Sequence, residues 1–214
     1  VEQPYLTEYF YDKEDLNLRY ITISQEISDY IADKYQVEGI VINNGIDEGI
    51  FLNNDKINKK ASTLFSLSQS NDFNEKLKVL CKELKLKFSC ANKWENPKFD
   101  ISQEIKKSDI VVSLGRGAYE SMMAGKFVIV ADERGYQGGK ADGAITKENI
   151  DKMLYSNCSG RAFNFSPTLL YLKQEINKYN KKSCEFNRKY AKSNFSLKKQ
   201  VDKILSLKIW ENQN

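Results

Sequence analysis

Short apolar runs that alternate with helical stretches constrain the fold of this chain more than any other feature. Runs such as IVVS at 110–113 and FVIVA at 127–131 carry no charge, as is typical of strands buried on both faces. Strands separated by about 10–15 residues of helical pattern are typical of parallel sheets with crossover helices. The sequence therefore predicts an α/β fold with a doubly wound parallel sheet. Its strands are expected near residues 38–43, 62–68, 86–91, 109–114 and 127–131.

Capped amphipathic segments connect the predicted strands. Ser24 can cap a helix that carries Ile27 and Ile31 one turn apart, because its hydroxyl can accept from a free N–H at the helix start. Phe73 and Leu77 share one face of a second predicted helix. These helices supply the crossovers that parallel strands need.

The domain organisation follows from where the strands stop. We expect one Rossmann-like domain over residues 21–166, followed by helices over residues 167–214 that pack on it. The helical tail is expected to break near residues 182–183 and 193–194. Residues 1–20 show no clear period, so we expect them to form a packing segment or the remnant of a preceding domain.

Composition excludes several classes of protein. The chain of 214 residues is 29% charged and lacks the run of about 18 apolar residues that a membrane-spanning helix needs. Its net charge of +4 is too small to require a nucleic-acid partner. Lysines are frequent after residue 172, and a solvated helix face explains them better than an anionic membrane surface. We therefore expect a cytoplasmic protein, with peripheral association at the inner membrane face as the alternative.

The chain contains no histidine. Ser-His-Asp, Cys-His and histidine-dependent zinc mechanisms are therefore excluded for this chain alone. The four cysteines are far apart in the sequence and form no CxxC pair, so we expect reduced thiols and no metal or other cofactor.

A Gly-x-Gly turn follows the predicted strand at 109–114. Gly115, Arg116 and Gly117 lead directly into a predicted helix, where free backbone N–H groups and the helix dipole favour an anion. Arg116 adds a planar cation, and Glu120 lies one turn further, where it could accept from ribose hydroxyls. The turn could equally need its glycines for backbone reasons alone, and Glu120 could simply complement the helix end.

A second candidate loop follows the predicted strand at 127–131. Gly138, Gly139 and Lys140 form its centre, and flexible backbone beside a cation suits a lid that orders on an anionic ligand. The alternative is a disordered surface loop. Trp94, in the loop after the strand at 86–91, could stack on a base, although packing explains it as well.

Several loops occur in an order typical of one enzyme family. NNGID at 43–47 is followed by SDIVVSLGRGAYESMMAGKFVIVAD at 108–132, a glycine-rich loop and NCSGR at 157–161. This order resembles the C-terminal, nucleotide-sugar-binding domain of GT-B glycosyltransferases of the group 1, family 4-like type. The resemblance extends over about residues 21–161.

The resemblance implies a function for the candidate residues. A nucleotide-diphosphate sugar would be the substrate, with Glu120 on the ribose and the helix start at Gly115–Gly117 on the diphosphate. Asn44 and Gly45 of the first motif would also lie at the donor. The acceptor-binding domain would be a separate, preceding partner, and the pathway would be surface polysaccharide synthesis with a glycan or lipid-linked acceptor.

Two positions depart from the family pattern. The family spaces two glutamates eight residues apart, whereas Val112 stands eight residues before Glu120. Basic residues common after the second strand are replaced here by Ser68, Gln69 and Asn71. A GT-B-like sugar-nucleotide epimerase and a non-catalytic nucleotide-binding module therefore stand as alternatives to a transferase. The missing histidine and carboxylate pair count against the epimerase.

Overall fold

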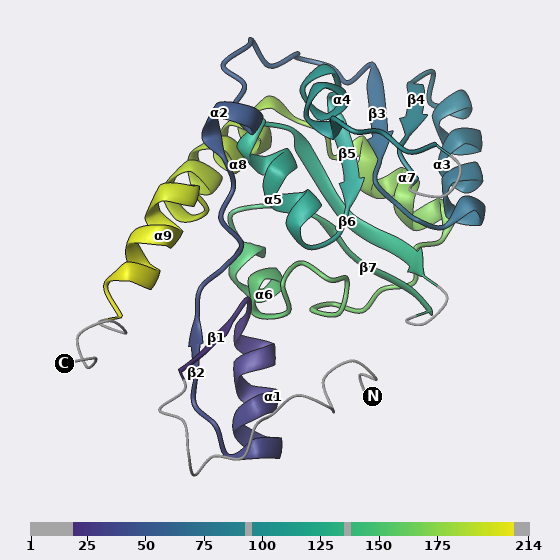
Figure 1. The fold of residues 1–214 in the computed structure, drawn as a ribbon. Coiled ribbons are helices and arrows are strands. Elements are labelled where there is room, and N and C mark those ends of the chain that lie inside the picture. Colours follow the sequence, from purple (N-terminus) through teal and green to yellow (C-terminus); the bar gives the residue numbers. More distant parts are fainter. Residues whose placement is uncertain (1–18, 93–95, 135–137, 208–214) are drawn as a thin grey trace, which may run out of the picture.

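A computed structural model describes residues 19–92, 96–134 and 138–207 of the chain (Figure 1). Its main sheet has five strands in the order β4-β3-β5-β6-β7. The first four run parallel, and β7 runs antiparallel to β6. The strands are β3 (Thr63–Ser66), β4 (Lys87–Cys90), β5 (Ile110–Ser113), β6 (Phe127–Arg134) and β7 (Gly138–Ala144).

Helices flank both faces of this sheet, a mixed α/β arrangement consistent with a Rossmann-like fold (Figure 1). One face packs mainly on α3 and α7, and the other packs mainly on α2, α4, α5 and α6. The helices are α1 (Gln25–Tyr35), α2 (Glu48–Phe51), α3 (Asn71–Glu83), α4 (Ile101–Lys107), α5 (Arg116–Met123), α6 (Ile150–Tyr155), α7 (Leu169–Asn177), α8 (Lys181–Asn194) and α9 (Leu197–Leu205).

The alternating side chains of the central strands build two cores. In β5, Ile110 and Val112 face the core beneath α3 and α7, whereas Val111 faces the core beneath α5. All three side chains are fully buried. The apolar runs of the sequence are therefore explained by burial on both sides of the sheet.

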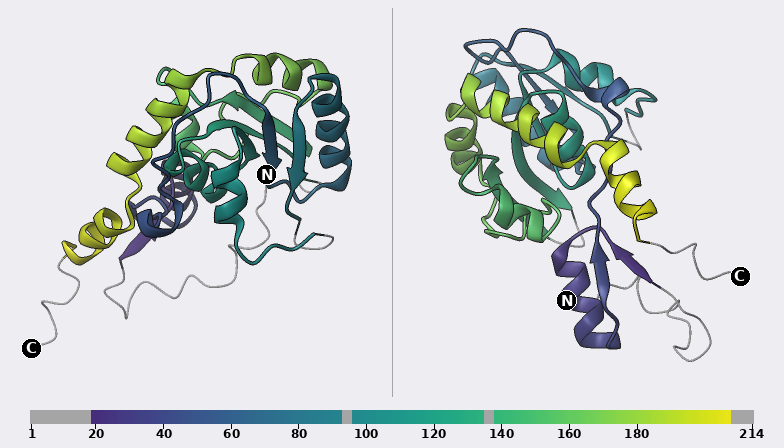
Figure 2. Two further views of the ribbon diagram at one scale, coloured as in Figure 1. Left: turned by 90° about the horizontal axis from the view of Figure 1, so that it is seen from above. Right: turned by 90° about the vertical axis from the view of Figure 1, so that its left-hand side faces the viewer.

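The strand predicted at 38–43 forms, but the prediction that it belongs to the main sheet is wrong. β2 (Gly39–Val41) pairs instead with β1 (Tyr20–Thr22) in a separate parallel pair connected by α1. All three residues of β2 are only half-buried, so this strand lacks the two-sided burial of the central strands. Figures 1 and 2 show this unit projecting from one end of the main body.

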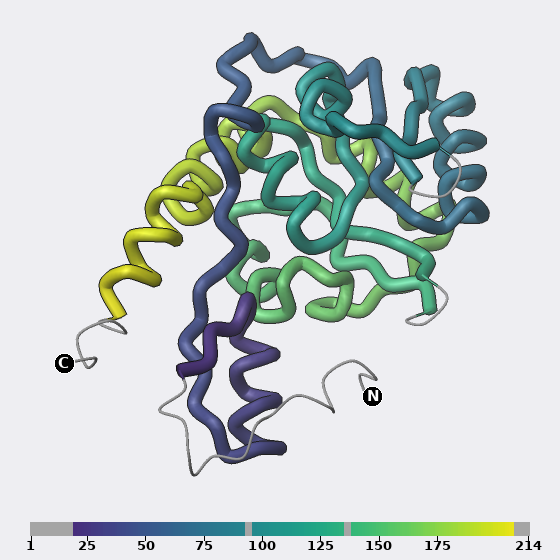
Figure 3. The backbone as a smooth tube through the Cα atoms, in the orientation of Figure 1, coloured from purple at the N-terminus to yellow at the C-terminus, as the bar shows by residue number. Residues whose placement is uncertain are grey.

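The chain returns from β2 to the main body along the C-terminal helices (Figure 3). The N–H of Ile46 donates to the carbonyl of Phe195 at 2.7 Å, and the N–H of Leu197 donates to the carbonyl of Ile46 at 2.9 Å. Ile46 itself is fully buried. The segment after β2 is thus held at the junction between α8 and α9.

The fifth strand of the main sheet was not predicted. Residues 138–140, expected in a flexible lid, belong to β7, which pairs antiparallel with the end of β6. The sequence of β7, GGKADGA, has neither the β-branched residues nor the apolar alternation by which a strand is recognised in a sequence. Gly138 and Gly143 in this strand also adopt positive φ. The entirely parallel sheet of the prediction is corrected accordingly.

The C-terminal tail is helical, as predicted, but its first break lies earlier than expected. α7 ends at Asn177 and Asn180 caps α8, with its side chain accepting from the N–H of Ser183. The break predicted near 182–183 therefore lies at residues 178–180, because Asn180 is the N-cap of α8. The break predicted near 193–194 is confirmed, since α8 ends at Asn194. Within the described part of the chain, no helix is long and apolar enough to cross a membrane.

Candidate functional site

The main sheet contains a switch in the direction in which successive strands are added. β3 lies between β4 and β5, so the chain leaves β3 toward one edge of the sheet and later returns to its other side. In open α/β sheets, ligands bind beyond the carboxyl ends of the strands at such a switch. We therefore expect ligand-binding residues near the ends of β3 and β5.

The helix that follows β5 begins with two uncommitted backbone donors. Gly115 has φ +55°, a conformation that favours glycine, and its N–H donates to the carbonyl of Cys158 at 2.9 Å. The N–H groups of Arg116 and Gly117 have no acceptor among the residues that the structure describes. Both belong to the first turn of α5, where the helix dipole also favours an anion.

An ion pair joins the first two turns of α5. The Nε of Arg116 lies 2.8 Å from Oε1 of Glu120, and the side chains are 62% and 7% exposed respectively. Oε2 of Glu120 accepts no hydrogen bond from the described residues. Burial raises the pKa of the Glu120 carboxyl above its ordinary value of 4.5, and Arg116 offsets only part of that effect. The site thus presents a largely desolvated acid beside an exposed guanidinium.

Gly117 lies in a tightly packed position. A Cβ at this position would lie 2.3 Å from Oγ of Ser113 and 3.0 Å from Cδ1 of Leu67. The close approach of α5 to the ends of β3 and β5 therefore explains this glycine without any ligand. A bulky residue at 117 would disturb the fold as well as any bound anion.

A loop that the motif analysis had not assigned supports the start of α5. Oδ2 of Asp142 accepts from the N–H of Gly160 at 3.0 Å, and Oδ1 accepts from the N–H of Phe163 at 2.8 Å. Burial raises the pKa of Asp142, although these backbone hydrogen bonds oppose the shift. The loop so held includes Cys158, whose carbonyl binds the N–H of Gly115. Asp142 therefore positions the Gly-x-Gly turn indirectly.

Asn157 in the same loop contacts α5 directly. Its Oδ1 accepts from the hydroxyl of Tyr119 at 2.8 Å, and its φ of +57° is one that asparagine tolerates better than most residues. In the sequence, residues 157–160 belong to the last motif of the series that ends in NCSGR, and that motif does not predict a contact with α5. Its contact with α5 depends on a long-range approach that no local pattern shows.

A buried polar network lies beside this site, and the sequence analysis did not identify it. The Ser68 hydroxyl donates to Oδ1 of Asp132, and the Nε of Arg134 donates to Oδ2 of the same carboxylate. Ser68 and Asp132 are each 2% exposed. Ser68 ends the strand predicted at 62–68 and Asp132 follows the strand predicted at 127–131, and these positions were the only indication that the two residues could meet. The network ties the loop after β3 to the end of β6.

Other predicted residues make no hydrogen bond with the start of α5 among the residues that the structure describes. Gly45 packs on α9, where a Cβ would lie 2.8 Å from Cδ1 of Leu197, and neither Asn44 nor Gly45 has a hydrogen bond to the described start of α5. Gly138, Gly139 and Lys140 pair with Arg134, Glu133 and Asp132 in the β6–β7 hairpin. Trp94 lies outside the described residues.

Two motif positions have structural roles. Oδ2 of Asp109 accepts from the N–H of Ser62 at 2.8 Å and from the N–H of Thr63 at 3.1 Å. Burial alone would raise the pKa of Asp109, but these bonds and the amide of Asn58 together hold it below the ordinary value. Val112 is fully buried in β5. A second acid eight residues before Glu120 would therefore lie in the core.

The described residues contain no group of three or more His, Cys, Asp or Glu side chains that could hold a metal ion. The site consists instead of backbone donors, one arginine and one buried carboxylate, all at the start of α5. No protein-family model matches the chain, and no curated protein matches it either.

Proposed function

We propose that this chain is the nucleotide-sugar donor-binding domain of a glycosyltransferase. The diphosphate lies over the start of α5, and the ribose hydroxyls bind Glu120. The observation that carries the proposal is the Arg116–Glu120 pair, in which one carboxylate oxygen and the outer guanidinium nitrogens are left uncommitted within the described chain.

The diphosphate is assigned to the backbone donors and to Arg116. Two free N–H groups at a helix start favour a phosphate oxygen, and the dipole of α5 adds to the attraction. The guanidinium of Arg116 is 62% exposed, so it can form a charge-assisted bidentate contact without being drawn out of the core. Binding the diphosphate would then neutralise a cation that now has only one acidic partner.

The ribose is assigned to Glu120. An ionised carboxylate accepts hydrogen bonds from both hydroxyls of a diol, and bonds to charged groups contribute about 1.5–3 kcal/mol each. Glu120 is partly desolvated before any ligand arrives, which strengthens such contacts. An acid whose only role was to complement the helix end would be expected to remain in water.

The fold supports the same proposal. A mostly parallel sheet with helices on both faces and a switch between β3 and β5 is consistent with a Rossmann-like domain, and the donor half of a GT-B enzyme would have such a domain. The motif order from NNGID to NCSGR is the second support. Buried Val112 leaves no acid in the family's other glutamate position, so the sugar must be held by other groups.

Calorimetric titration of this chain with UDP, GDP, CDP, ADP and TDP tests the proposal. We expect one of the five to bind, and Arg116→Gln to weaken that binding. Lys82→Gln is the matched control, because Lys82 is an exposed residue in the last turn of α3. Failure of all five nucleotides to bind would overturn the proposal. Transfer or hydrolysis of the sugar by the chain with its acceptor domain would separate a transferase from a non-catalytic module.

A further inference from the structure

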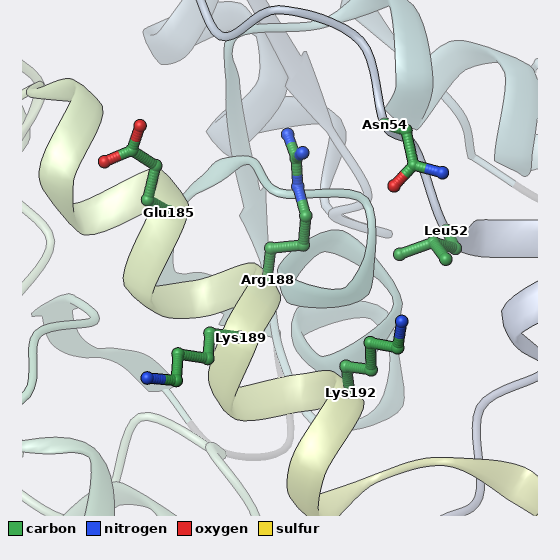
Figure 4. A pocket seen from close by; sticks show the side chains of 6 residues that line it. All are labelled: Leu52, Asn54, Glu185, Arg188, Lys189 and Lys192. Carbon is green, nitrogen blue, oxygen red and sulfur yellow. The ribbon is translucent and has the colours of Figure 1, made fainter.

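A groove lies between α8 and the segment after α2. It has a volume of about 290 Å³, near the lower end of the range for small-ligand pockets. Figure 4 shows Arg188 and Lys192 extending from α8 toward Leu52 and Asn54. The lining residues are Leu52, Asn54, Glu185, Arg188, Lys189 and Lys192.

The charges around this groove are unbalanced. The four α8 residues are spaced i, i+3, i+4 and i+7, so they share one face of the helix. Glu185 is the acid among them, and it pairs with Lys181 at 3.2 Å. No ion pair involves Arg188, Lys189 or Lys192 within residues 19–92, 96–134 and 138–207. Three cations therefore line the groove without acidic partners.

Arg188 is the most constrained of these cations. Its Nε is buried and has no hydrogen-bond partner in the described structure, while one terminal nitrogen donates to the carbonyl of Asp55 at 3.2 Å. The guanidinium lies against Gly125, where a Cβ would be 2.5 Å from Nε. Within the described residues the guanidinium makes one hydrogen bond and no ion pair, so it keeps donors for a bound anion.

A second, half-buried cation, Lys126, lies close to Arg188. The Nζ of Lys126 donates to the carbonyl of Lys106 at 2.6 Å. Burial lowers the pKa of Lys126, and the charge of Arg188 contributes in the same direction, whereas the carboxylates of Asp109 and Asp55 oppose it. Arg188 thus disfavours the charged form of Lys126, although Asp109 and Asp55 counter this effect, and an anion bound between α8 and the 52–55 segment would act in the same direction as these two acids.

We propose that this groove binds a phosphate group of a phosphorylated ligand. Arg188 forms its inner wall, and Lys192 and Lys189 supply the outer contacts. The groove is separate from the start of α5, because Gly125 and Lys126 follow the other end of that helix, about 12 Å away along its eight residues. Nothing in the proposed donor site is needed for this binding.

Nuclear magnetic resonance locates the binding directly. Titration of the labelled chain with pyrophosphate should shift amide signals of Asn54 and of residues 185–192, with saturation. Lys192→Gln should weaken this binding by about two- to fivefold, the range for an exposed charge pair. Lys182→Gln is the control on the same helix, because Lys182 is exposed and does not line the groove.

Arg116→Gln separates this site from the donor site. The groove signals should respond to pyrophosphate with unchanged affinity in that variant, even if signals at the start of α5 no longer respond. Absence of saturable shifts in the groove, or equal groove affinities in Lys192→Gln and the wild type, would overturn the proposal.

Vesicles distinguish the two sources of the phosphate. If the ligand is a lipid headgroup, the chain should sediment with phosphatidylglycerol vesicles but not with phosphatidylcholine vesicles, and Lys192→Gln should reduce sedimentation while Lys182→Gln should not. If the ligand is soluble, pyrophosphate should occupy the groove and neither vesicle should bind. When pyrophosphate produces saturable shifts in the groove, either vesicle result supports a phosphate site and identifies its source. Without those shifts, sedimentation with vesicles does not support the proposal.

Discussion

The Nε of Arg116 lies 2.8 Å from one carboxylate oxygen of Glu120, while the other oxygen accepts no hydrogen bond within the described chain. The pair joins an acid that is 7% exposed to a cation that is 62% exposed. An exposed pair of this spacing contributes little to helix stability, whereas burial of the acid has a cost. That cost is the reason to assign the pair a role beyond folding.

The contact between Gly117 and Ser113 predicts a steric effect on stability. Gly117→Ala should lower the free energy of unfolding by about 1–3 kcal/mol, because its Cβ would lie 2.3 Å from Oγ of Ser113. Alanine would otherwise stabilise a helix relative to glycine. Thermal or urea unfolding measures the change.

Two variants control for this interpretation. Gly49→Ala, where the nearest atom to a new Cβ is Oδ1 of Asp47 at 3.1 Å, should be nearly neutral. Ser113→Ala combined with Gly117→Ala should recover part of the loss, because the closest obstructing atom is removed. If Gly117→Ala were as stable as the wild type, the Ser113 hydroxyl would not obstruct a side chain at position 117.

The hydrogen bonds of Asp109 predict that the free energy of unfolding depends on pH. Asp109→Asn should lower the free energy of unfolding by about 1–3 kcal/mol, because its carboxylate accepts from Ser62 and Thr63 and an amide group would face those donors. The pKa of Asp109 is held below its ordinary value of 3.8. Its contribution is therefore present above that value and is lost as the pH falls through the folded-state pKa.

Urea unfolding of both proteins at pH 7 and near pH 3 measures this contribution. The stability difference between wild type and Asp109→Asn should shrink at the lower pH. A difference that stays constant or grows on acidification would show that the Asp109 hydrogen bonds do not favour the ionised carboxyl.

Asp142 predicts a local change near the candidate site. Asp142→Asn replaces an oxygen that accepts from the N–H of Gly160 or Phe163 by an amide donor. Hydrogen exchange should therefore quicken at these two amides and at Gly115, which depends on the same loop through Cys158. Unchanged exchange at Gly115 would mean that the loop does not position the Gly-x-Gly turn.

The sequence predicted the central strands because each is buried on both faces. β5 and β6 show this pattern directly, with uncharged runs at 110–113 and 127–131. The sequence could not assign β2 to a sheet, because the residues of a short strand do not show which other strand it pairs with. β7 was hidden because glycine-rich strands lack apolar alternation.

The candidate site was predicted only where it is local. Gly115, Arg116, Gly117 and Glu120 follow one another in a single turn and helix, so their spacing is set by helical geometry. The meeting of Ser68 with Asp132 and the support from Asp142 depend on contacts between distant segments. The tight packing at Gly117 also appears only once α5 is placed against Ser113.

Glu120 predicts opposite effects on stability and on binding. Its folded-state pKa is raised above 4.5 by burial, so the stability associated with its protonated form is lost as the pH rises through that pKa. Glu120→Gln removes this dependence and should melt at or above the wild-type temperature at pH 7. Thermal unfolding between pH 4 and pH 7 checks the sign, and a variant that melts well below the wild type would contradict it.

The affinity of Glu120→Gln for a nucleoside diphosphate tests the central claim most directly. Calorimetry with the nucleotide that binds the wild type should show a loss of about 1 kcal/mol or more, roughly fivefold in Kd. Glu83→Gln, an exposed glutamate at the far end of α3, should leave the affinity unchanged. Equal affinities for Glu120→Gln and the wild type would contradict the assignment of Glu120 to the ribose and with it the donor-binding function.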